Sequence, residues 1–483
     1  MGRSLFRMTG AAVAGAVCAA LFSGGGAASA ASAASHVVAA SSGGTWAKAE
    51  QVPGTRPLNT GGYAMTQSVS CASAGDCVAG GYYTHGVDQE AFVVNETNGT
   101  WGGAQETAAA LNTDGGAAVD SVSCASAGNC SAGGYYTGSS KASQAFVVDE
   151  TGGKWSAAAE VAGALNKGIG AQINSVSCAS AGNCGAGGYY TASSGHAQAF
   201  VISEKNGAWG AAKEVAGALN SKDAQLISVS CASAGDCSAA GFYTDRSGHI
   251  QAFVVDEAGG VWGSAEQVPG TAALNKGGSA GVNSVSCASA GDCSAGGSYA
   301  DGSGPAEAFV VDEKGGTWGD AQEVPGIAAL NQGGNGAEVN SVSCASAGNC
   351  SAGGQYTPAN AGGAAFVVND ASGVWGRAEE VPGSGALNQG GLAAISSVSC
   401  ASAGDCSAGG FYADASNDQQ ALVVGETNGV WGRAEEVPGT AALNPGGQAE
   451  VAWLSCGSVD HCAAGGEYLD DNFGQQAFVD TES

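Results

Sequence analysis

Positive charge is scarce in this sequence. Its 483 residues include 15 lysines and arginines against 43 aspartates and glutamates, which gives a formal net charge of −28 at pH 7. A field of this sign repels nucleic acids and anionic membrane surfaces. We therefore expect no nucleic-acid partner.

Long hydrophobic runs are also missing, except at the N-terminus. Arg3 and Arg7 precede an apolar run at residues 11–22, and small residues suited to cleavage follow at 28–30 or 31–33. This order is typical of an export signal. We expect a signal peptide over residues 1–30, no membrane insertion after its removal, and an extracellular protein with one domain over residues 31–483.

Cysteine is the most regular residue that is present. Beyond Cys18, which lies inside the signal, 16 cysteines recur as eight pairs spaced 53 to 57 residues apart. Seven pairs lie within the phrase Ser-Val-Ser-Cys-Ala-Ser-Ala-Gly-(Asp/Asn)-Cys, and the last copy keeps the cysteines but changes the residues between them. An even number of cysteines in an exported chain predicts disulfides, and the C-x5-C spacing does not suit a zinc knuckle. The expected disulfides are Cys71–Cys77, Cys124–Cys130, Cys178–Cys184, Cys231–Cys237, Cys287–Cys293, Cys344–Cys350, Cys400–Cys406 and Cys456–Cys462.

One repeat predicts four antiparallel strands, which we name a to d. In the copy at residues 175–220, the cysteine pair encloses the a–b turn, residues 199–202 form strand c, Asn206-Gly207 is a hairpin turn, and Trp209 opens strand d. Four strands in about 55 residues describe a propeller blade. We therefore predict an all-β, eight-bladed β-propeller of four-stranded antiparallel blades.

The two ends of the chain predict how the ring closes. Residues 46–52 are a d-type strand without its own a, b and c strands, and residues 477–480 are a c-type strand without a following d strand. Pairing them completes an eighth blade. Residues 36–40 are a candidate remnant of a c strand, so the composition of this closing blade is left open.

The repeat resembles two blade families. Gly133-Gly134 followed by Tyr136 and Trp155 is similar to kelch repeats, and Glu150 five residues before Trp155 is similar to the Asp-box of sialidase-type propellers. The sequence also resembles secreted actinobacterial proteins with repeated cysteines. These resemblances imply that the shared residues are structural.

Each connector from strand d to the next strand a carries a Leu-Asn pair. The favoured interpretation is that the asparagine caps the connector by bonding its own backbone. The alternative is a ring of amides that binds a ligand. These candidates are Asn59, Asn112, Asn166, Asn220, Asn275, Asn331, Asn388 and Asn444.

The b–c loops vary most from repeat to repeat, which is how a binding scaffold diversifies. Asp245, Asp301, Asp414 and Asp470 in these loops are candidate Ca²⁺ ligands. No D-x-D-x-D-G pattern is present, so solvated turn carboxylates are the favoured interpretation and we expect no other cofactor or metal. A Gln or Glu that we expect to be structural precedes strand c in seven repeats: Glu90, Gln144, Gln198, Gln251, Glu307, Gln420 and Gln476, with Ala364 in the eighth.

Catalysis is not expected. A sialidase needs three arginines at one site, and only Arg56, Arg246, Arg377 and Arg433 follow the signal. With 43 acidic residues, any carboxylate pair chosen from sequence is arbitrary. We predict a secreted, non-catalytic binding or scaffolding propeller for a glycan or cell-surface polymer. The alternatives are a divergent glycoside hydrolase or lyase and a purely structural surface protein. The oligomeric state is left open.

Overall fold

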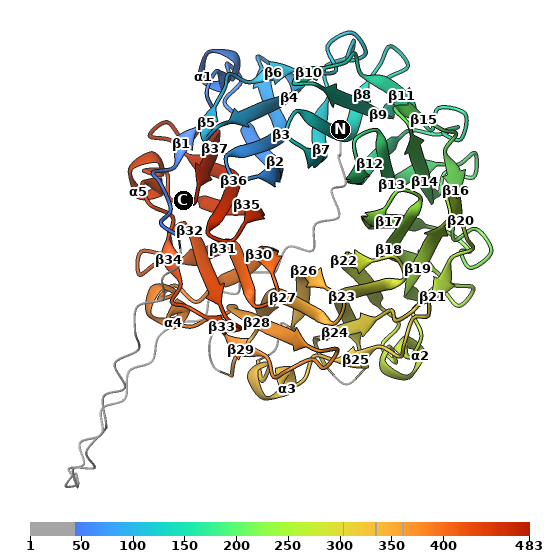
Figure 1. Cartoon of the computed structure of the whole chain (residues 1–483), viewed down its shortest axis with the longest axis vertical. Helices are drawn as coiled ribbons and strands as arrows, with labels where there is room; N and C mark the ends of the chain where they lie inside the picture. Colours follow the sequence, from blue (N-terminus) through green and yellow to red (C-terminus); the bar gives the residue numbers. More distant parts are fainter. Residues whose placement is uncertain (1–43, 303, 334–335, 360–361) are drawn as a thin grey trace, which may run out of the picture. The chain divides into compact units, whose positions relative to one another are not determined.

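The computed structural model describes residues 44–302, 304–333, 336–359 and 362–483. The predicted signal and the candidate strand at residues 36–40 lie outside the described residues. The described chain forms eight antiparallel sheets arranged in a ring (Figure 1), which confirms the eight-bladed propeller. We number the blades 1 to 8 in chain order. No helix in the described part of the chain is long and apolar enough to cross a membrane.

The two inner strands of every blade are long. Strand a lies nearest the ring axis and pairs with strand b (Figure 1). The a strands are β2 (Ala64–Ser73), β7 (Ala118–Ser126), β12 (Ala171–Ser180), β17 (Ala224–Ser233), β22 (Ala280–Ser289), β26 (Glu338–Ser346), β30 (Ala393–Ser402) and β35 (Ala449–Ser458). The b strands are β3 (Asp76–His85), β8 (Asn129–Thr137), β13 (Asn183–Thr191), β18 (Asp236–Thr244), β23 (Asp292–Ala300), β27 (Asn349–Tyr356), β31 (Asp405–Ala413) and β36 (His461–Leu469).

Strand c carries the outermost strand d, which is interrupted. The c strands are β4 (Asp88–Thr97), β9 (Ser143–Thr151), β14 (Ala197–Lys205), β19 (Ile250–Ala258), β24 (Ala306–Asp312), β28 (Ala364–Ala371), β32 (Gln419–Thr427) and β37 (Gln475–Thr481). The first part of strand d contains the repeated tryptophan: β5 (Thr100–Trp101), β10 (Lys154–Trp155), β15 (Ala208–Trp209), β20 (Val261–Trp262) and β33 (Val430–Trp431), with single bridges in blades 5, 6 and 8. The second part is β6 (Gln105–Glu106), β11 (Ala159–Val161), β16 (Lys213–Glu214), β21 (Glu266–Gln267), β25 (Gln322–Glu323), β29 (Glu379–Glu380), β34 (Glu435–Glu436) and β1 (Glu50–Gln51).

Single helical turns open five of the connectors after strand d. They are α1 (Thr55–Leu58), α2 (Thr271–Leu274), α3 (Ile327–Leu330), α4 (Ser384–Leu387) and α5 (Thr440–Leu443).

The chain termini close the ring. The N-terminal strand β1 pairs antiparallel with the C-terminal strand β37 and completes blade 8. The cluster between blades 8 and 1 contains buried Val52, Phe92, Trp101 and Val479, and the other junctions have equivalent clusters. Fully burying a side chain such as Phe92 stabilises the fold by roughly 2 kcal/mol. The predicted closure is therefore confirmed.

The Ser-Val-Ser-Cys phrase joins neighbouring a strands. The backbone N–H of Val122 in blade 2 donates to Ser68 Oγ of blade 1 (3.0 Å), and that of Cys124 donates to Ser70 Oγ (2.9 Å). Across the closing junction, the Cys71 N–H donates to Ser455 Oγ in the same way (3.0 Å). The two serines satisfy backbone donors that strand a cannot pair inside its own blade.

The other repeated features are steric or covalent. All eight predicted disulfides are present, each joining directly opposed residues of strands a and b. A Cβ on Gly80 would lie 2.5 Å from Val119 of the next blade, and one on Gly81 would lie 1.9 Å from the Met65 carbonyl oxygen. Close approach of backbones therefore explains the double glycine.

Candidate functional site

The loops of the propeller divide between two faces. The d–a connectors and b–c loops form the loop face, where the Gly61 N–H of a connector donates to the carbonyl of Thr84 at the end of β3 (2.9 Å). The a–b and c–d turns form the turn face, where the Gly99 N–H donates to the Gly75 carbonyl (2.9 Å). The connectors and the b–c loops therefore share one face.

The connector asparagines tie each blade to the one before it. Asn112 Nδ2 donates to the backbone oxygen of Gln89 (2.9 Å) and to the carboxylate of Glu90 (2.8 Å), both in blade 1, while its Oδ1 accepts the N–H of Gly116 in its own connector (2.8 Å). The same side-chain contact joins Asn59 to Gln476, Asn166 to Gln144, Asn220 to Gln198, Asn275 to Gln251, Asn331 to Glu307 and Asn444 to Gln420.

The eighth connector asparagine, Asn388, shows that the side-chain contact requires a Gln or Glu before strand c. Asn388 faces the position of Ala364, so its Nδ2 donates to the backbone oxygen of Gly363 (2.9 Å) without a side-chain partner, while its Oδ1 still accepts the N–H of Leu392 (2.7 Å). The Gln or Glu before strand c is thus a hydrogen-bonding partner of the asparagine. The asparagine caps its connector, as predicted, and also joins two blades. Ligand contact by these amides stays a prediction.

Asp245, Asp414 and Asp470 hold their own b–c loops in shape. In Asp470, Oδ1 accepts the backbone N–H groups of Asn472 and Gly474 (both 2.9 Å), and Oδ2 accepts the amide of Gln476 (2.9 Å). Burial opposes the charged form of each aspartate, but these hydrogen bonds outweigh it and hold the pKa below its usual value.

The fourth candidate calcium ligand, Asp301, follows β23 in the b–c loop of blade 5. Among the residues that the structure describes, no group of three or more His, Cys, Asp or Glu side chains is arranged to hold a metal ion. Calcium binding by the b–c loops stays a prediction.

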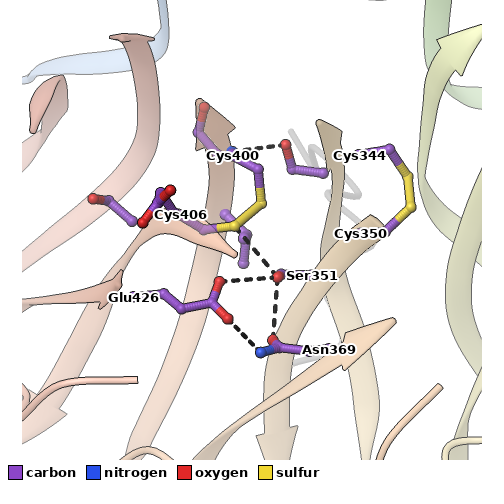
Figure 2. The surroundings of a disulfide bond; sticks show 12 residues. Cys344, Cys350, Ser351, Asn369, Cys400, Cys406 and Glu426 are labelled. Atoms are coloured by element: carbon purple, nitrogen blue, oxygen red, sulfur yellow. Dashed lines mark hydrogen bonds between the residues drawn. A yellow bond between two sulfur atoms is a disulfide. The ribbon is translucent and has the colours of Figure 1, made fainter. Parts of the chain in front are cut away.

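The turn face carries a ring of buried carboxyl groups, one per blade, at the end of strand c. Figure 2 shows it at the junction of blades 6 and 7: the Ser351 hydroxyl donates to Glu426 Oε2 (3.3 Å) and lies 3.3 Å from Cys406 Sγ. Asn369 Nδ2 donates to the same carboxylate, and Asn369 Oδ1 accepts the indole N–H of Trp431 (2.9 Å). The ring is Glu96, Glu150, Glu204, Glu257, Glu313, Asp370, Glu426 and Glu482.

The side chain that faces each buried carboxyl group influences the pKa of that group. At junctions 1/2 and 6/7 an asparagine faces it, but at junctions 2/3, 4/5 and 5/6 the neighbour is a second carboxylate, from Asp149, Asp256 and Asp312. Burial, followed by repulsion from Asp256, raises the pKa of Glu313 to about 7. Burial and then Asp312 raise that of Asp370 to about 6.

A cavity of about 470 Å³ lies between blades 5 and 6 on the turn face. Asp312, Glu313, Lys314 and Asp370 line it beside the disulfides of both blades. Asp370 is one methylene shorter than the glutamates at the other junctions, and this shorter side chain leaves part of the cavity between blades 5 and 6 unfilled.

The sequence did not identify two sets of residues. The buried carboxyl ring has a sequence signal, an acidic residue five positions before seven of the tryptophans, but this pattern alone shows only a likeness to the Asp-box. The second set is the exposed aromatic side chains, Tyr63, Trp453 and Phe473. All three belong to blades 8 and 1, which only the closure of the ring makes neighbours.

The comparisons with known proteins show no family. No protein-family description and no curated protein matches this chain. Among solved structures, Sqt1 of Chaetomium thermophilum bound to the N-terminus of ribosomal protein L10 is 11% identical over 87% of this chain and 98% of its own, with a TM-score of 0.47. A PL25 ulvan lyase is 12% identical over 83% of this chain and 95% of its own (TM-score 0.41), and the Hadza microbial sialidase Hz136 is 11% identical over 69% and 68% (TM-score 0.37). Likeness at this level carries no argument about function.

Proposed function

We propose that this chain is an exported, non-catalytic binding or scaffolding module whose loop face binds a carbohydrate or another cell-surface polymer. One observation carries the proposal: the loop face keeps its connector hydrogen bonds from blade to blade while the side chains on its b–c loops change. A rigid frame with variable loops is the usual construction of a binding surface.

The net charge of the protein restricts the class of polymer that its loop face can bind. A net charge of −28 disfavours polyanions at the distances over which charges act in physiological salt. Neutral or cationic polymers are therefore better candidate ligands for this negatively charged protein. The b–c loops of blades 4, 7 and 8 are also held by their own aspartates, so these three loops are ordered before a ligand arrives, which reduces the entropy lost on binding.

The proposal is tested with the intact, oxidised protein on insoluble and arrayed polysaccharides. We expect binding to neutral polymers such as β-glucan, mannan or chitin that persists in 0.5 M NaCl, and none to polyuronates. Adding EDTA tests whether binding requires calcium. Binding that is lost in EDTA and restored by Ca²⁺ would support Ca²⁺ ligation by the b–c loops. Absence of binding to every polymer contradicts the proposal and favours a purely structural role.

The turn-face cavity is the observation that favours catalysis instead. A carboxyl group with a pKa near 7, such as that of Glu313, suits a general acid, and a second carboxyl group lines the same cavity. Release of reducing ends or of unsaturated sugars from a polysaccharide panel, abolished in Glu313→Gln, establishes a hydrolase or lyase. We expect no release, because buried carboxyl groups occupy the equivalent position in every blade and join the blades there.

A further inference from the structure

Three b–c loops share one backbone frame. Their aspartates, Asp245, Asp414 and Asp470, each accept the N–H groups of the residues two and four positions later, and each also accepts the amide of a glutamine six positions later. The aspartate N–H donates to the carbonyl four residues on in all three loops (2.8 to 2.9 Å). Blades 4, 7 and 8 thus present loops of the same shape.

The connector of the next blade lies against each of these loops in the same way. Ser279 forms a bridge with Ile250, Gln448 with Gln419, and Tyr63 with Gln475. The last bridge is accompanied by a bond from the Gln475 N–H to the Gly62 carbonyl (2.8 Å). Junctions 4/5, 7/8 and 8/1 therefore display two side chains on one common frame, one from the loop and one from the connector.

Of these three junctions, only that of blades 8 and 1 displays two aromatic side chains. Where junctions 4/5 and 7/8 carry Gly248 with Ser279 and Asn417 with Gln448, this junction carries Phe473 with Tyr63. The Phe473 side chain is 73% exposed and that of Tyr63 is 58% exposed.

Phe473 also pays a conformational penalty for its position. Its φ is +58°, in the left-handed region that Gly248 (+84°) and Asn417 (+65°) occupy at the equivalent positions. Glycine and asparagine tolerate this region, but for a bulky residue it costs about 1 kcal/mol or more. An exposed aromatic ring gains little from packing in return. Strain of this kind at an exposed residue is characteristic of binding sites.

The surroundings of the two rings match a sugar more closely than an apolar partner. Asp471 and Asn472 are exposed beside Phe473 and offer carboxylate and amide groups, and the Asn472 amide donates to Asp471 (3.0 Å). A pyranose has flat C–H faces that stack on aromatic rings and hydroxyl edges that bond to such polar groups. The net charge of −28 selects a neutral sugar over a uronate or sulfated one.

We propose that Tyr63 and Phe473 form the aromatic platform of a binding site for a neutral polysaccharide at the junction of blades 8 and 1. The proposal rests on the proposed function and locates it at one junction. The loop aspartate Asp470 positions the platform, and the two rings stack on sugar units.

The frame shared with junction 7/8 supplies a matched experiment. The double variant Y63Q/F473N gives the closing junction the side chains of junction 7/8, and N417F/Q448Y gives junction 7/8 the aromatic pair. On the neutral polysaccharide that the wild type binds, we expect Y63Q/F473N to lose affinity by about 30-fold. We expect N417F/Q448Y to increase the binding capacity from one site per chain to two, measured by calorimetry with a soluble oligosaccharide.

The outcomes separate this inference from the proposed function. If wild type binds a neutral polysaccharide and Y63Q/F473N binds it within 2-fold, the platform is wrong and the proposed function stands. If wild type binds no glycan, both fail, and capture of a protein by the same two residues then identifies a protein interface instead. Thermal unfolding checks folding, and if Y63Q/F473N does not fold, an unchanged capacity in N417F/Q448Y overturns the platform.

Discussion

The turn face and the loop face of the ring differ in which features recur from blade to blade. The turn face repeats its chemistry: every junction has a disulfide and a buried carboxyl group, and most have a tryptophan N–H bonded to the preceding blade. The loop face repeats its backbone contacts while the side chains on its b–c loops change. Stability requires the same bonds at each junction, whereas recognition requires difference at one of them. This difference is what we expect if the turn face holds the ring together and the loop face binds the ligand, as proposed.

Removal of the disulfides is expected to have the largest effect. Each closes a short loop and stabilises the fold by about 2 kcal/mol in the chain-entropy model. Urea unfolding of the reduced protein should therefore show a transition shifted far below that of the oxidised protein. Equal transition midpoints would show that the turn face is not held by its disulfides.

Removing one disulfide tests the same point at a single blade. C231S/C237S should lower the free energy of unfolding by about 2 kcal/mol, and its polysaccharide affinity should stay within 2-fold of wild type because the disulfide lies on the other face. A large loss of affinity in this variant would remove the distinction between the faces.

The paired carboxyl groups of the turn face predict a stability that depends on pH. The folded-state pKa of Glu204 and of Glu313 is raised from 4.5 to about 7, so the folded chain binds more protons than the unfolded chain between these values. Their contribution is fully present below pH 4.5 and is lost as the pH rises through 7. We expect a higher melting temperature at pH 5 than at pH 8.

Neutral replacements at two junctions sharpen this prediction. Glu313→Gln removes the repulsion from Asp256 and should stabilise the protein at pH 8 by on the order of 1 kcal/mol, with a flatter pH profile. Glu150→Gln is the control, because Glu150 faces the amide of Asn95 instead of a second carboxylate, so the substitution relieves no repulsion and weakens a charge-assisted hydrogen bond. Equal responses of the two variants would mean that the neighbouring carboxylate does not matter.

Phe473→Gly separates stability from binding at one residue. Glycine relieves the strain of the positive φ, so the free energy of unfolding should rise by about 0.5–1 kcal/mol while polysaccharide binding is lost. Asn417→Gly, at the equivalent position of blade 7, should change both by less, because asparagine already tolerates this conformation. Thermal unfolding and oligosaccharide titration measure the two effects. Destabilisation by Phe473→Gly would indicate that the ring packs rather than binds.

The sequence predicted what is repeated and missed what depends on neighbours. Cysteine spacing gave the blade count, and the unmatched strands at both ends gave the closure. It did not predict that Asn112 bonds to Glu90, which requires the connector to fold back over strand c. Nor did it predict that Asp256 faces Glu313, because that contact joins two repeats and is fixed only by the stacking of blades. Tyr63 and Phe473 lie more than 400 residues apart, and an isolated exposed aromatic residue has no periodic signal.

Trp453→Ser is expected to have the smallest effect, and it tests whether binding at the closing junction is confined to the loop face. In the seven other junctions the first serine of the repeated phrase accepts a backbone N–H from the next blade, as Ser397 does from Leu454 (3.0 Å). Trp453 takes that place in β35 and is 45% exposed. Serine should restore the acceptor for the Val69 N–H and raise the free energy of unfolding by about 0.5 kcal/mol. Because Trp453 pairs with Gly465 in the middle of the inner strands and not in a loop of the loop face, we expect polysaccharide affinity to stay within 2-fold. A tenfold loss would instead extend the site from the loop face towards the ring axis.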